Sequence, residues 1–292
     1  MSENTLLYYL KKSEEFLQKK GISSPRVDAE WILADLLGLS RIQLYAKFDM
    51  PLSQKEILDY REKIVERGKN KPVAYITGKK GFHKFDFFVN EHTLIPRPET
   101  EDLVEYIYKN WNGISIDFLD QTSVHVWDLC CGSGNIGISL TKLVPNIQMI
   151  LSDLSPDALE VTKKNIQNHN VEDRTQCYVS NLGDGIPREL KFDLVVTNPP
   201  YIPVSEKEDL MPDVLNYEPH LALFIENFLE FHKEILSVIL NRLKPGGSFF
   251  METHPDYIHD LEKLAKDFGF VSTEILKDSS DKNRFLSAKK DN

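Results

Sequence analysis

A side-chain amide stands directly after a buried-strand pattern, at a position where it could hold a planar nitrogen group. Residues 193–197 are largely apolar and β-branched, which predicts a buried strand. The strand must end at Pro199 and Pro200, because proline cannot donate to a β-ladder. Asn198 is therefore expected at a carboxyl strand end, the edge at which open α/β sheets bind their ligands.

The chemistry offered at this strand end is hydrogen-bond acceptance beside an aromatic ring. Asn198 can accept through its amide oxygen and donate through its nitrogen, the carbonyl of Pro199 is a second acceptor, and Tyr201 supplies a flat ring. Two acceptors beside a ring suit a planar NH2 group, either a carboxamide or the exocyclic amine of a base. For an isolated Asn-Pro pair, a rigid loop capped by Asn198 would be the better interpretation. The four residues together predict a catalytic and substrate-binding role, and they are Asn198, Pro199, Pro200 and Tyr201.

A second segment with chemical potential, residues 128–137, lies between a predicted strand and a predicted helix. Gly132 and Gly134 allow a tight turn and a close approach of the backbone to a ligand. With Gly137 they also satisfy the spacing of dinucleotide-binding loops, which alone is weak evidence. Asp128 argues against a dinucleotide, because a carboxylate there would repel a pyrophosphate and would pair with a cationic ligand.

The next strand also ends in a carboxylate, Asp153, which could accept from both hydroxyls of a ribose. A ligand with one ribose, no phosphate and a positive centre is S-adenosylmethionine, and this is the cofactor that the sequence predicts. The alternative is that Asp128 and Asp153 only cap the loop and the following helix. Asn181 and Leu182 follow the third strand, where they are expected at the edge and the face of adenine. The predicted cofactor-binding residues are Asp128, Cys130, Cys131, Gly132, Ser133, Gly134, Asp153, Asn181, Leu182 and Asn198.

The elements that position these residues form an alternating pattern from residue 124 onward. Such alternation of strands with helices predicts a doubly wound parallel sheet of the Rossmann-like type. Seven strands are expected, at residues 124–128, 147–152, 176–180, 192–198, 247–253, 273–276 and 285–289, with helices at 136–144, 156–168, 227–244 and 257–268. Residues 112–123 carry no clear pattern and are predicted to form a loop.

A proline-rich segment precedes this sheet. Its prolines keep residues 95–98 extended, and a helix to about Asn110 is expected after them. Arg97 and Glu99 are charged residues in this turn, and either a solvated corner or a role at the cleft would explain them. Their place just before the sheet favours the cleft, and both are predicted to bind substrate.

The N-terminal region, residues 1–72, is predicted to be helical. Ser24 with Pro25 is typical of a helix start and Gly38 of its end. Ser53 with a glutamate three residues later forms a capping box, which predicts a further helix to about residue 67. Because no catalytic constellation occurs here, this region is expected to recognise a substrate or to extend the fold structurally. A β-hairpin linker is predicted at residues 73–95, and the catalytic domain at residues 96–292.

Composition limits the possible functions. The net charge of −10 argues against sequence-independent binding of a phosphate backbone. The three cysteines and eight histidines show no metal-ligand spacing, so no metal site is predicted. Residues 1–20 are rich in Lys and Glu and resemble neither a signal peptide nor a membrane span. We therefore expect a cytoplasmic protein without membrane association.

Taken together, these motifs resemble the glutamine N5-methyltransferases that modify peptide chain release factors. The resemblance covers nearly the whole chain, and its most family-specific stretch is Pro-Arg-Pro-Glu-Thr-Glu at residues 96–101. It implies a class I methyltransferase domain with a small N-terminal helical domain that would grip the substrate. It also implies methylation of the glutamine in the Gly-Gly-Gln loop of class I release factors. The matching stretches are residues 72–78, 94–101, 128–134, 153–159, 198–202, 218–219, 222–223 and 243–247, together with Arg284.

The chain departs from this family pattern at four places, and three alternative functions stay open. Cys130 replaces a usual glycine, Asn181 replaces a usual aspartate, and residues 224–227 and 253–255 replace segments that usually contain glycine. Asn-Pro-Pro-Tyr also occurs in adenine-N6 methyltransferases of DNA and RNA, against which the acidic charge weighs. The second alternative function is methylation of a glutamine in a ribosomal protein. The third is a non-catalytic module that binds S-adenosylmethionine.

Overall fold

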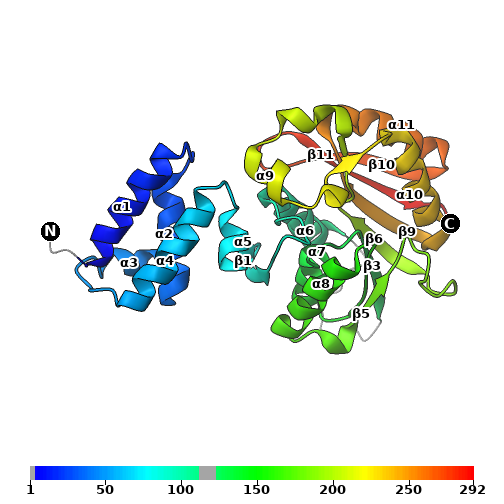
Figure 1. Cartoon of the computed structure of the whole chain (residues 1–292). Coiled ribbons are helices and arrows are strands. Elements are labelled where there is room, and N and C mark those ends of the chain that lie inside the picture. The colour runs from blue at the N-terminus through cyan, green and yellow to red at the C-terminus, as the bar shows by residue number, and fades with distance from the viewer. Residues whose placement is uncertain (1–3, 112–122) are drawn as a thin grey trace. The chain divides into compact units, whose positions relative to one another are not determined.

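The computed structural model describes residues 4–111 and 123–292, which divide into two compact units (Figure 1). The helical unit extends to Lys79 and includes Leu210–Tyr217. The catalytic unit comprises Lys80–Asp209 and Glu218–Asn292. Apart from Ser123, the loop predicted at 112–123 lies outside the described residues.

Two predicted helix caps of the helical unit are present in the structure. Ser53 accepts from the backbone N–H of Glu56, whose carboxylate accepts from the Ser53 N–H, so the predicted capping box is confirmed. Gly38 ends its helix in the left-handed conformation, as predicted. Buried leucine, isoleucine and tyrosine side chains form the core of this unit. Its helices are α1 (Leu6–Lys19), α2 (Pro25–Leu37), α3 (Arg41–Tyr45), α4 (Gln54–Arg67), α5 (Val73–Thr77) and α9 (Pro212–Tyr217).

The β-hairpin predicted from residue 73 begins later than expected. Val73–Thr77 forms one helical turn, α5, because the Pro72 carbonyl accepts from the Ile76 N–H and Gly78 closes the turn with φ +70°. The alternation of apolar residues in this turn imitates a strand. The hairpin itself is restricted to β1 (Lys79–Phe82) and β2 (Phe85–Phe88).

A seven-stranded sheet organises the catalytic unit, in the order β10-β11-β9-β6-β3-β4-β5. The predicted Rossmann-like sheet is confirmed, with the difference that β11 runs antiparallel to both of its neighbours. A short turn joins β10 to β11, and such a connection permits only antiparallel pairing. The strands are β3 (Val124–Leu129), β4 (Ile147–Asp153), β5 (Thr175–Val179), β6 (Phe192–Thr197), β9 (Leu243–Glu252), β10 (Phe270–Lys277) and β11 (Asn283–Lys290).

Helices cover both faces of this sheet (Figure 1). One apolar cluster joins the sheet to α6, α7 and α8, and a second joins it to α10 and α11. The helices are α6 (Pro98–Asn110), α7 (Asn135–Leu143), α8 (Pro156–His169), α10 (Phe228–Arg242) and α11 (Ile258–Asp267). The catalytic unit also contains a pair of short strands and several short helical turns. These are β7 (Ile202–Pro203), β8 (Phe224–Ile225), η1 (Glu172–Arg174), η2 (Val204–Asp209), η3 (His220–Ala222) and η4 (Pro255–Tyr257).

The register of the sheet brings the carboxyl ends of the parallel strands to one edge. Leu129 of β3 pairs with Thr197 of β6 on one side and with Ser152 of β4 on the other. The Thr197 hydroxyl donates to the Leu129 carbonyl at 2.6 Å, which fixes the ends of β3 and β6 together. The loops that follow these strands therefore leave the sheet side by side.

Candidate active site

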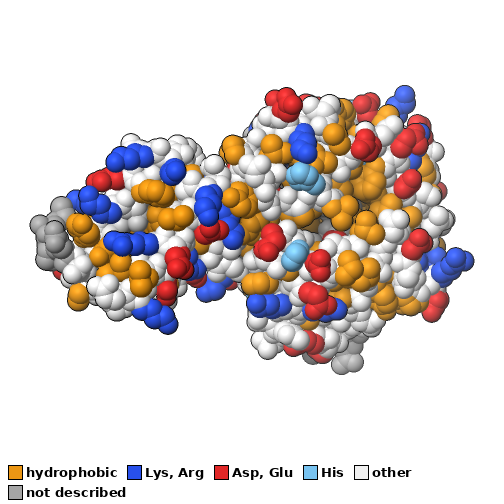
Figure 2. Space-filling view, in the orientation of Figure 1, with side chains coloured by type: hydrophobic (Ala, Val, Ile, Leu, Met, Phe, Trp, Pro, Cys, Tyr) orange, Lys and Arg blue, Asp and Glu red, His pale blue; other side chains and the backbone are white. Residues whose placement is uncertain are grey.

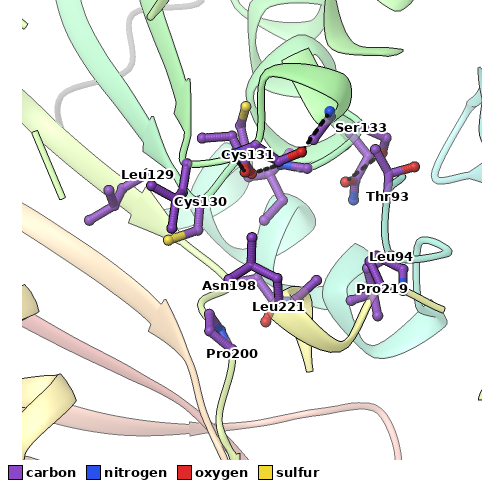
Figure 3. A pocket seen from close by; sticks show the side chains of 18 of the residues that line it. Thr93, Leu94, Leu129, Cys130, Cys131, Ser133, Asn198, Pro200, Pro219 and Leu221 are labelled. Carbon is purple, nitrogen blue, oxygen red and sulfur yellow. Dashed lines mark hydrogen bonds between the residues drawn. The ribbon is translucent and has the colours of Figure 1, made fainter. Parts of the chain in front are cut away.

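A cavity opens at this edge of the sheet, entirely within the catalytic unit. One wall is the loop after β3, and Asn198 and Pro200 border the cavity from the end of β6 (Figure 3). Further walls come from the segment before α6 and from the turn η3. The lining residues are His92, Thr93, Leu94, Pro96, Arg97, Thr100, Leu129, Cys130, Cys131, Gly132, Ser133, Asn135, Ile136, Asp153, Leu154, Ser155, Ala158, Ser180, Asn181, Leu182, Asn198, Pro200, Pro219, Leu221, Ala222 and Phe231.

The loop after β3 turns through three left-handed backbone conformations. Cys130 has φ +60°, Gly132 +54° and Gly134 +78°. A side chain at Gly134 would meet Ile138 at 2.8 Å, whereas a side chain at Gly132 would meet none of the described atoms within 4 Å. Glycine is thus required at Gly134 by conformation and packing, and the backbone at Gly132 faces open space into which a ligand fits.

Asp153 presents a carboxylate to the cavity. Its Oδ2 accepts from the Gly132 N–H at 2.9 Å, and its Oδ1 accepts from the Ser155 N–H at 2.9 Å. Burial raises the pKa of Asp153, while these two backbone donors act against that shift. Because each oxygen carries a second lone pair, the carboxylate can still accept from two hydroxyl groups.

Asp128 lies behind the loop and does not line the cavity. The side chain is fully buried, and its Oδ2 accepts from the Gly137 N–H at 2.8 Å. Its Oδ1 has no hydrogen-bond partner among the described residues. Burial raises the pKa of Asp128 to about 7, and the nearby charge of Asp153 acts in the same direction. This carboxyl joins the end of β3 to the start of α7.

Asn198 belongs to a hydrogen-bonded network of side chains from three elements. Its Nδ2 donates to the Thr100 hydroxyl at 3.3 Å, and that hydroxyl donates to Oε2 of Glu252 at 2.7 Å. The Tyr201 hydroxyl donates to the other oxygen of Glu252 at 3.3 Å. Thr100 and Glu252 are both 1% exposed. The network therefore connects α6, the loop after β6 and the end of β9 away from bulk water.

The network also determines the electrostatics of Tyr201 and Glu252. Burial raises the pKa of the Tyr201 hydroxyl, and the Glu252 charge raises it further. Burial raises the pKa of Glu252 as well, but the bond from Thr100 and the charge of Arg284 oppose that shift. Tyr201 therefore stays a neutral donor to the Glu252 carboxylate. Its ring does not line the cavity.

An ion pair fastens the proline-rich segment to the segment before η3. Arg97 Nη2 lies 2.7 Å from Oε1 of the buried Glu218, whose Oε2 accepts from the Ile95 N–H at 3.1 Å. Arg97 lines the cavity and Glu99 does not. The two segments thus form one continuous wall opposite the glycine-containing loop.

Most of the residues selected from the sequence meet in this one cavity. Five of them lie outside its lining, namely Asp128, Gly134, Pro199, Tyr201 and Glu99. The others border it, and they are Asn198, Pro200, Cys130, Cys131, Gly132, Ser133, Asp153, Asn181, Leu182 and Arg97.

Sequence reasoning missed several residues of the site. Thr100 stands in a family-like stretch and Glu252 directly before a departure from the family pattern, but nothing in their local sequence connects them with Asn198. Phe231 and Leu221 add apolar walls to the cavity. Asn165 of α8 is fully buried and bonds both backbone groups of Phe88 and the carbonyl of Ser133, so it fastens three segments together. A polar residue on the apolar face of α8 was the available signal for Asn165.

The cavity fits S-adenosylmethionine. Asp153 has free lone pairs for the ribose hydroxyls, the backbone at Gly132 leaves open space, and Leu182 and Phe231 offer apolar surfaces for a planar base. Asn181 can accept from an exocyclic amine through its side-chain oxygen. These are the features that a nucleoside needs.

Comparison with known proteins identifies both parts of the chain. A family model of the PrmC N-terminal domain matches residues 9–78, and a model of the methyltransferase small domain matches residues 114–216. A release factor glutamine methyltransferase from Leptospira interrogans is 48% identical over 286 residues, which cover 97% of this chain and 97% of that protein. The chain belongs to the release factor glutamine methyltransferase family.

A further relative agrees with this membership, and a solved structure agrees with the fold. A release factor glutamine methyltransferase from Chlorobaculum tepidum is 35% identical over 283 residues, 95% of each chain. A 16S rRNA methyltransferase from T. thermophilus, solved in complex with AdoMet and guanosine, has a TM-score of 0.51. It is 18% identical and covers 73% of this chain and 49% of its own, so it supports the fold alone. The catalytic unit is therefore an S-adenosylmethionine-dependent methyltransferase domain.

The departures from the family pattern have visible structural consequences. Cys130 adopts the left-handed conformation that favours the usual glycine. Phe224 and Ile225 form β8, and Asn227 caps α10 by accepting from the Glu230 N–H. His254 lies 3.2 Å from Glu206, so it ties the end of β9 to the turn η2.

The described residues 4–111 and 123–292 lack two features, a membrane-spanning helix and a cluster of metal ligands. No helix in these ranges combines the length and the apolar character needed to cross a membrane. No group of three or more His, Cys, Asp or Glu side chains gathers there as a metal site would require.

Proposed function

We propose that this chain transfers a methyl group from S-adenosylmethionine to the side-chain amide nitrogen of the Gly-Gly-Gln glutamine in a class I peptide chain release factor. The observation that carries the proposal is the position of Asn198 at the cavity that Asp153 and the glycine-containing loop also line. The relatives from L. interrogans and C. tepidum are both release factor glutamine methyltransferases.

In this proposal the Asn198 side-chain oxygen and the Pro199 carbonyl accept the two hydrogens of the substrate amide. Pro200 lines the cavity, and Tyr201 holds the loop in place through its bond to Glu252. These contacts supply orientation, which can lower a barrier by several kcal/mol when the reacting atoms are held at roughly 3–3.5 Å. Acceptors aimed at the amide hydrogens also stabilise the positive charge that develops on nitrogen.

The chemistry that S-adenosylmethionine supplies when bound is an electrophilic methyl group on a sulfonium. The transfer forms an N–C bond with the amide lone pair and breaks the S–C bond, whose electron pair leaves the sulfur neutral as a thioether. One amide proton passes to water. Asp153, Asn181 and Leu182 would hold the nucleoside, while Cys130, Cys131, Gly132 and Ser133 would surround the methionine part.

A protein partner agrees better with the charge of the chain than a nucleic acid does. The chain carries 45 acidic and 35 basic residues, and acidic and basic side chains are interspersed over the face of the catalytic unit drawn in Figure 2. We therefore propose no stable binding of nucleic acid, which would need clustered Lys and Arg. We also propose that the helical unit grips the release factor, and that the enzyme acts in the cytoplasm.

The test is methylation of a purified class I release factor with S-adenosylmethionine that carries a labelled methyl group. Mass spectrometry of the digested factor is expected to place the label on the Gly-Gly-Gln peptide. A factor with that glutamine replaced by alanine serves as the control and is expected to stay unlabelled. Label on a ribosomal protein or on added DNA or RNA, without label on the release factor, would replace this proposal with the corresponding alternative.

A further inference from the structure

We infer that Thr100 and Glu252 are positioning residues that fix the amide of Asn198 with its oxygen toward the substrate. The inference rests on the proposed function and adds to it the reason why Asn198 acts as an acceptor. An asparagine amide has two nearly isosteric orientations, and one of them would present NH2 to the substrate amide. The site therefore needs an arrangement of hydrogen bonds that excludes this second orientation.

This arrangement is a series of hydrogen bonds in which each donor and acceptor has a fixed direction. An ionised carboxylate can only accept, so Glu252 forces the Thr100 hydroxyl to point its proton at Oε2, 2.7 Å away. The Thr100 oxygen is then left with lone pairs alone toward Asn198, and these require the Nδ2 donor, 3.3 Å away. With Nδ2 so engaged, the oxygen of Asn198 is the group that remains for the ligand.

The surroundings keep this polarity from reversing. Glu252 and Thr100 are each 1% exposed, so water has little access to supply an alternative proton. Tyr201 donates to the second oxygen of Glu252, which leaves that carboxylate with donors on both sides. Burial raises the pKa of Glu252 and Glu99 acts in the same direction, while the hydrogen bond from Thr100, the charge of Arg284 on β11 and the hydrogen bond from Tyr201 oppose that shift and favour the carboxylate.

The strand register explains why the three groups meet. Thr197 of β6 pairs with Met251 of β9, so the residues that follow them, Asn198 and Glu252, lie next to each other at the edge of the sheet. Glu252 also pairs with Phe285 of β11, which holds it at the sheet edge. Thr100 reaches the same point from the first turn of α6. The orientation of the amide is thus prepared by the fold before any substrate binds.

The experiment compares Thr100→Val with Thr100→Ser in the full-length chain. Valine keeps the shape of threonine but removes the acceptor, so we expect kcat on the release factor to fall by roughly 10- to 100-fold. The dissociation constant for S-adenosylmethionine is expected to stay unchanged. Thr100→Ser restores the hydroxyl, and it is expected to recover most of the lost kcat.

A matched control separates orientation from general damage to the core. Thr141 is fully buried in α7, and its hydroxyl donates to the Gly137 carbonyl, outside the cavity lining. Thr141→Val is expected to keep kcat. Undiminished kcat in Thr100→Val overturns the inference, and so does a loss of cofactor affinity that equals the loss of kcat. Absence of methylation by the unaltered chain would instead refute the proposed function.

A second variant keeps the inference testable if Thr100→Val fails to fold. Glu252→Gln preserves the shape but allows a carboxamide NH2 to face Thr100, so the hydroxyl can turn its proton toward Asn198. We expect kcat to fall with unchanged cofactor affinity. Full activity of Glu252→Gln would show that the carboxylate does not impose the polarity, and would overturn the inference.

Discussion

The polarity of hydrogen bonding at Asn198 decides which group the candidate site can hold. Its Nδ2 already donates to Thr100, so the side chain faces the cavity as an acceptor. Asp153 has a separate task, because its carboxylate holds the loop around Gly132 and has lone pairs left for a ribose. The two side chains border the same cavity, but they act on different partners.

Substitution of these two residues is therefore expected to give opposite kinetic patterns. Asn198→Ala removes an acceptor for the substrate amide, and kcat should fall about 100-fold or more with unchanged affinity for S-adenosylmethionine. Asp153→Ala should instead weaken cofactor binding. Equilibrium binding of S-adenosylmethionine and initial-rate kinetics on a release factor measure both effects. Retained turnover in Asn198→Ala would refute its proposed role.

The buried carboxyl of Asp128 predicts a pH dependence of stability. Its ordinary pKa is 3.8 and burial raises it to about 7, so between these values the folded state holds a proton that the unfolded state has lost. The contribution of Asp128 to the free energy of unfolding is therefore fully present below pH 3.8, and it is lost as the pH rises to about 7. Because the folded and unfolded states differ by about one bound proton in this range, the free energy of unfolding should fall by roughly 1.4 kcal/mol per pH unit.

Urea unfolding of the catalytic unit across this pH range measures that slope. Asp128→Asn cannot titrate, so its unfolding free energy should lack the contribution while the other carboxylates titrate as before. The difference between the two proteins isolates Asp128. Parallel pH curves for both proteins would contradict the prediction.

At the scale of elements, strand periodicity and helix caps were sufficient to predict most of the architecture. The capping box at Ser53 and the strand before Asn198 rest on local signals, and both are present in the structure. The turn Val73–Thr77 was missed because its alternation of apolar residues is compatible with a strand. Thr100 could not be connected with Asn198 from sequence, since 98 residues separate them and only the packing of α6 against the sheet brings them together.

Asn165 shows how one side chain couples elements around the site. Its amide accepts from the Phe88 N–H at 2.7 Å and donates to the carbonyls of Phe88 and Ser133, each at 2.9 Å. It therefore fastens β2 and the glycine-containing loop to α8. Ser133 lines the cavity, so loss of this connection should weaken cofactor binding as well as the stability of the fold.

We expect Asn165→Ala to lower the unfolding free energy of the catalytic unit by about 2–4 kcal/mol, because three backbone groups lose their partner. Cofactor affinity should weaken with it. Asn168 lies exposed on the same helix, and Asn168→Ala should change stability by less than about 0.5 kcal/mol. Denaturant titration compares the two variants. Equal effects would mean that the bonds of Asn165 contribute no more than helix propensity.

At the scale of the whole molecule, two units have separate cores. The helical unit has its own cluster of buried leucine, isoleucine and tyrosine side chains, and the catalytic unit has two clusters on the faces of its sheet. All residues that line the candidate cofactor cavity belong to the catalytic unit. Cofactor binding should therefore raise the free energy of unfolding of the catalytic unit directly.

This arrangement predicts that S-adenosylmethionine stabilises the two units unequally. At a cofactor concentration about a hundred times its dissociation constant, the catalytic unit should gain about 2.7 kcal/mol, by mass action on its folded state. Hydrogen exchange followed by mass spectrometry measures this gain, because the slowest amides exchange through unfolding of the unit that contains them. Amides of β3 and β6 should slow markedly, while those of α1, α2 and α4 should exchange at unchanged rates. Equal slowing in both units would mean that they unfold as one cooperative body, despite their separate cores.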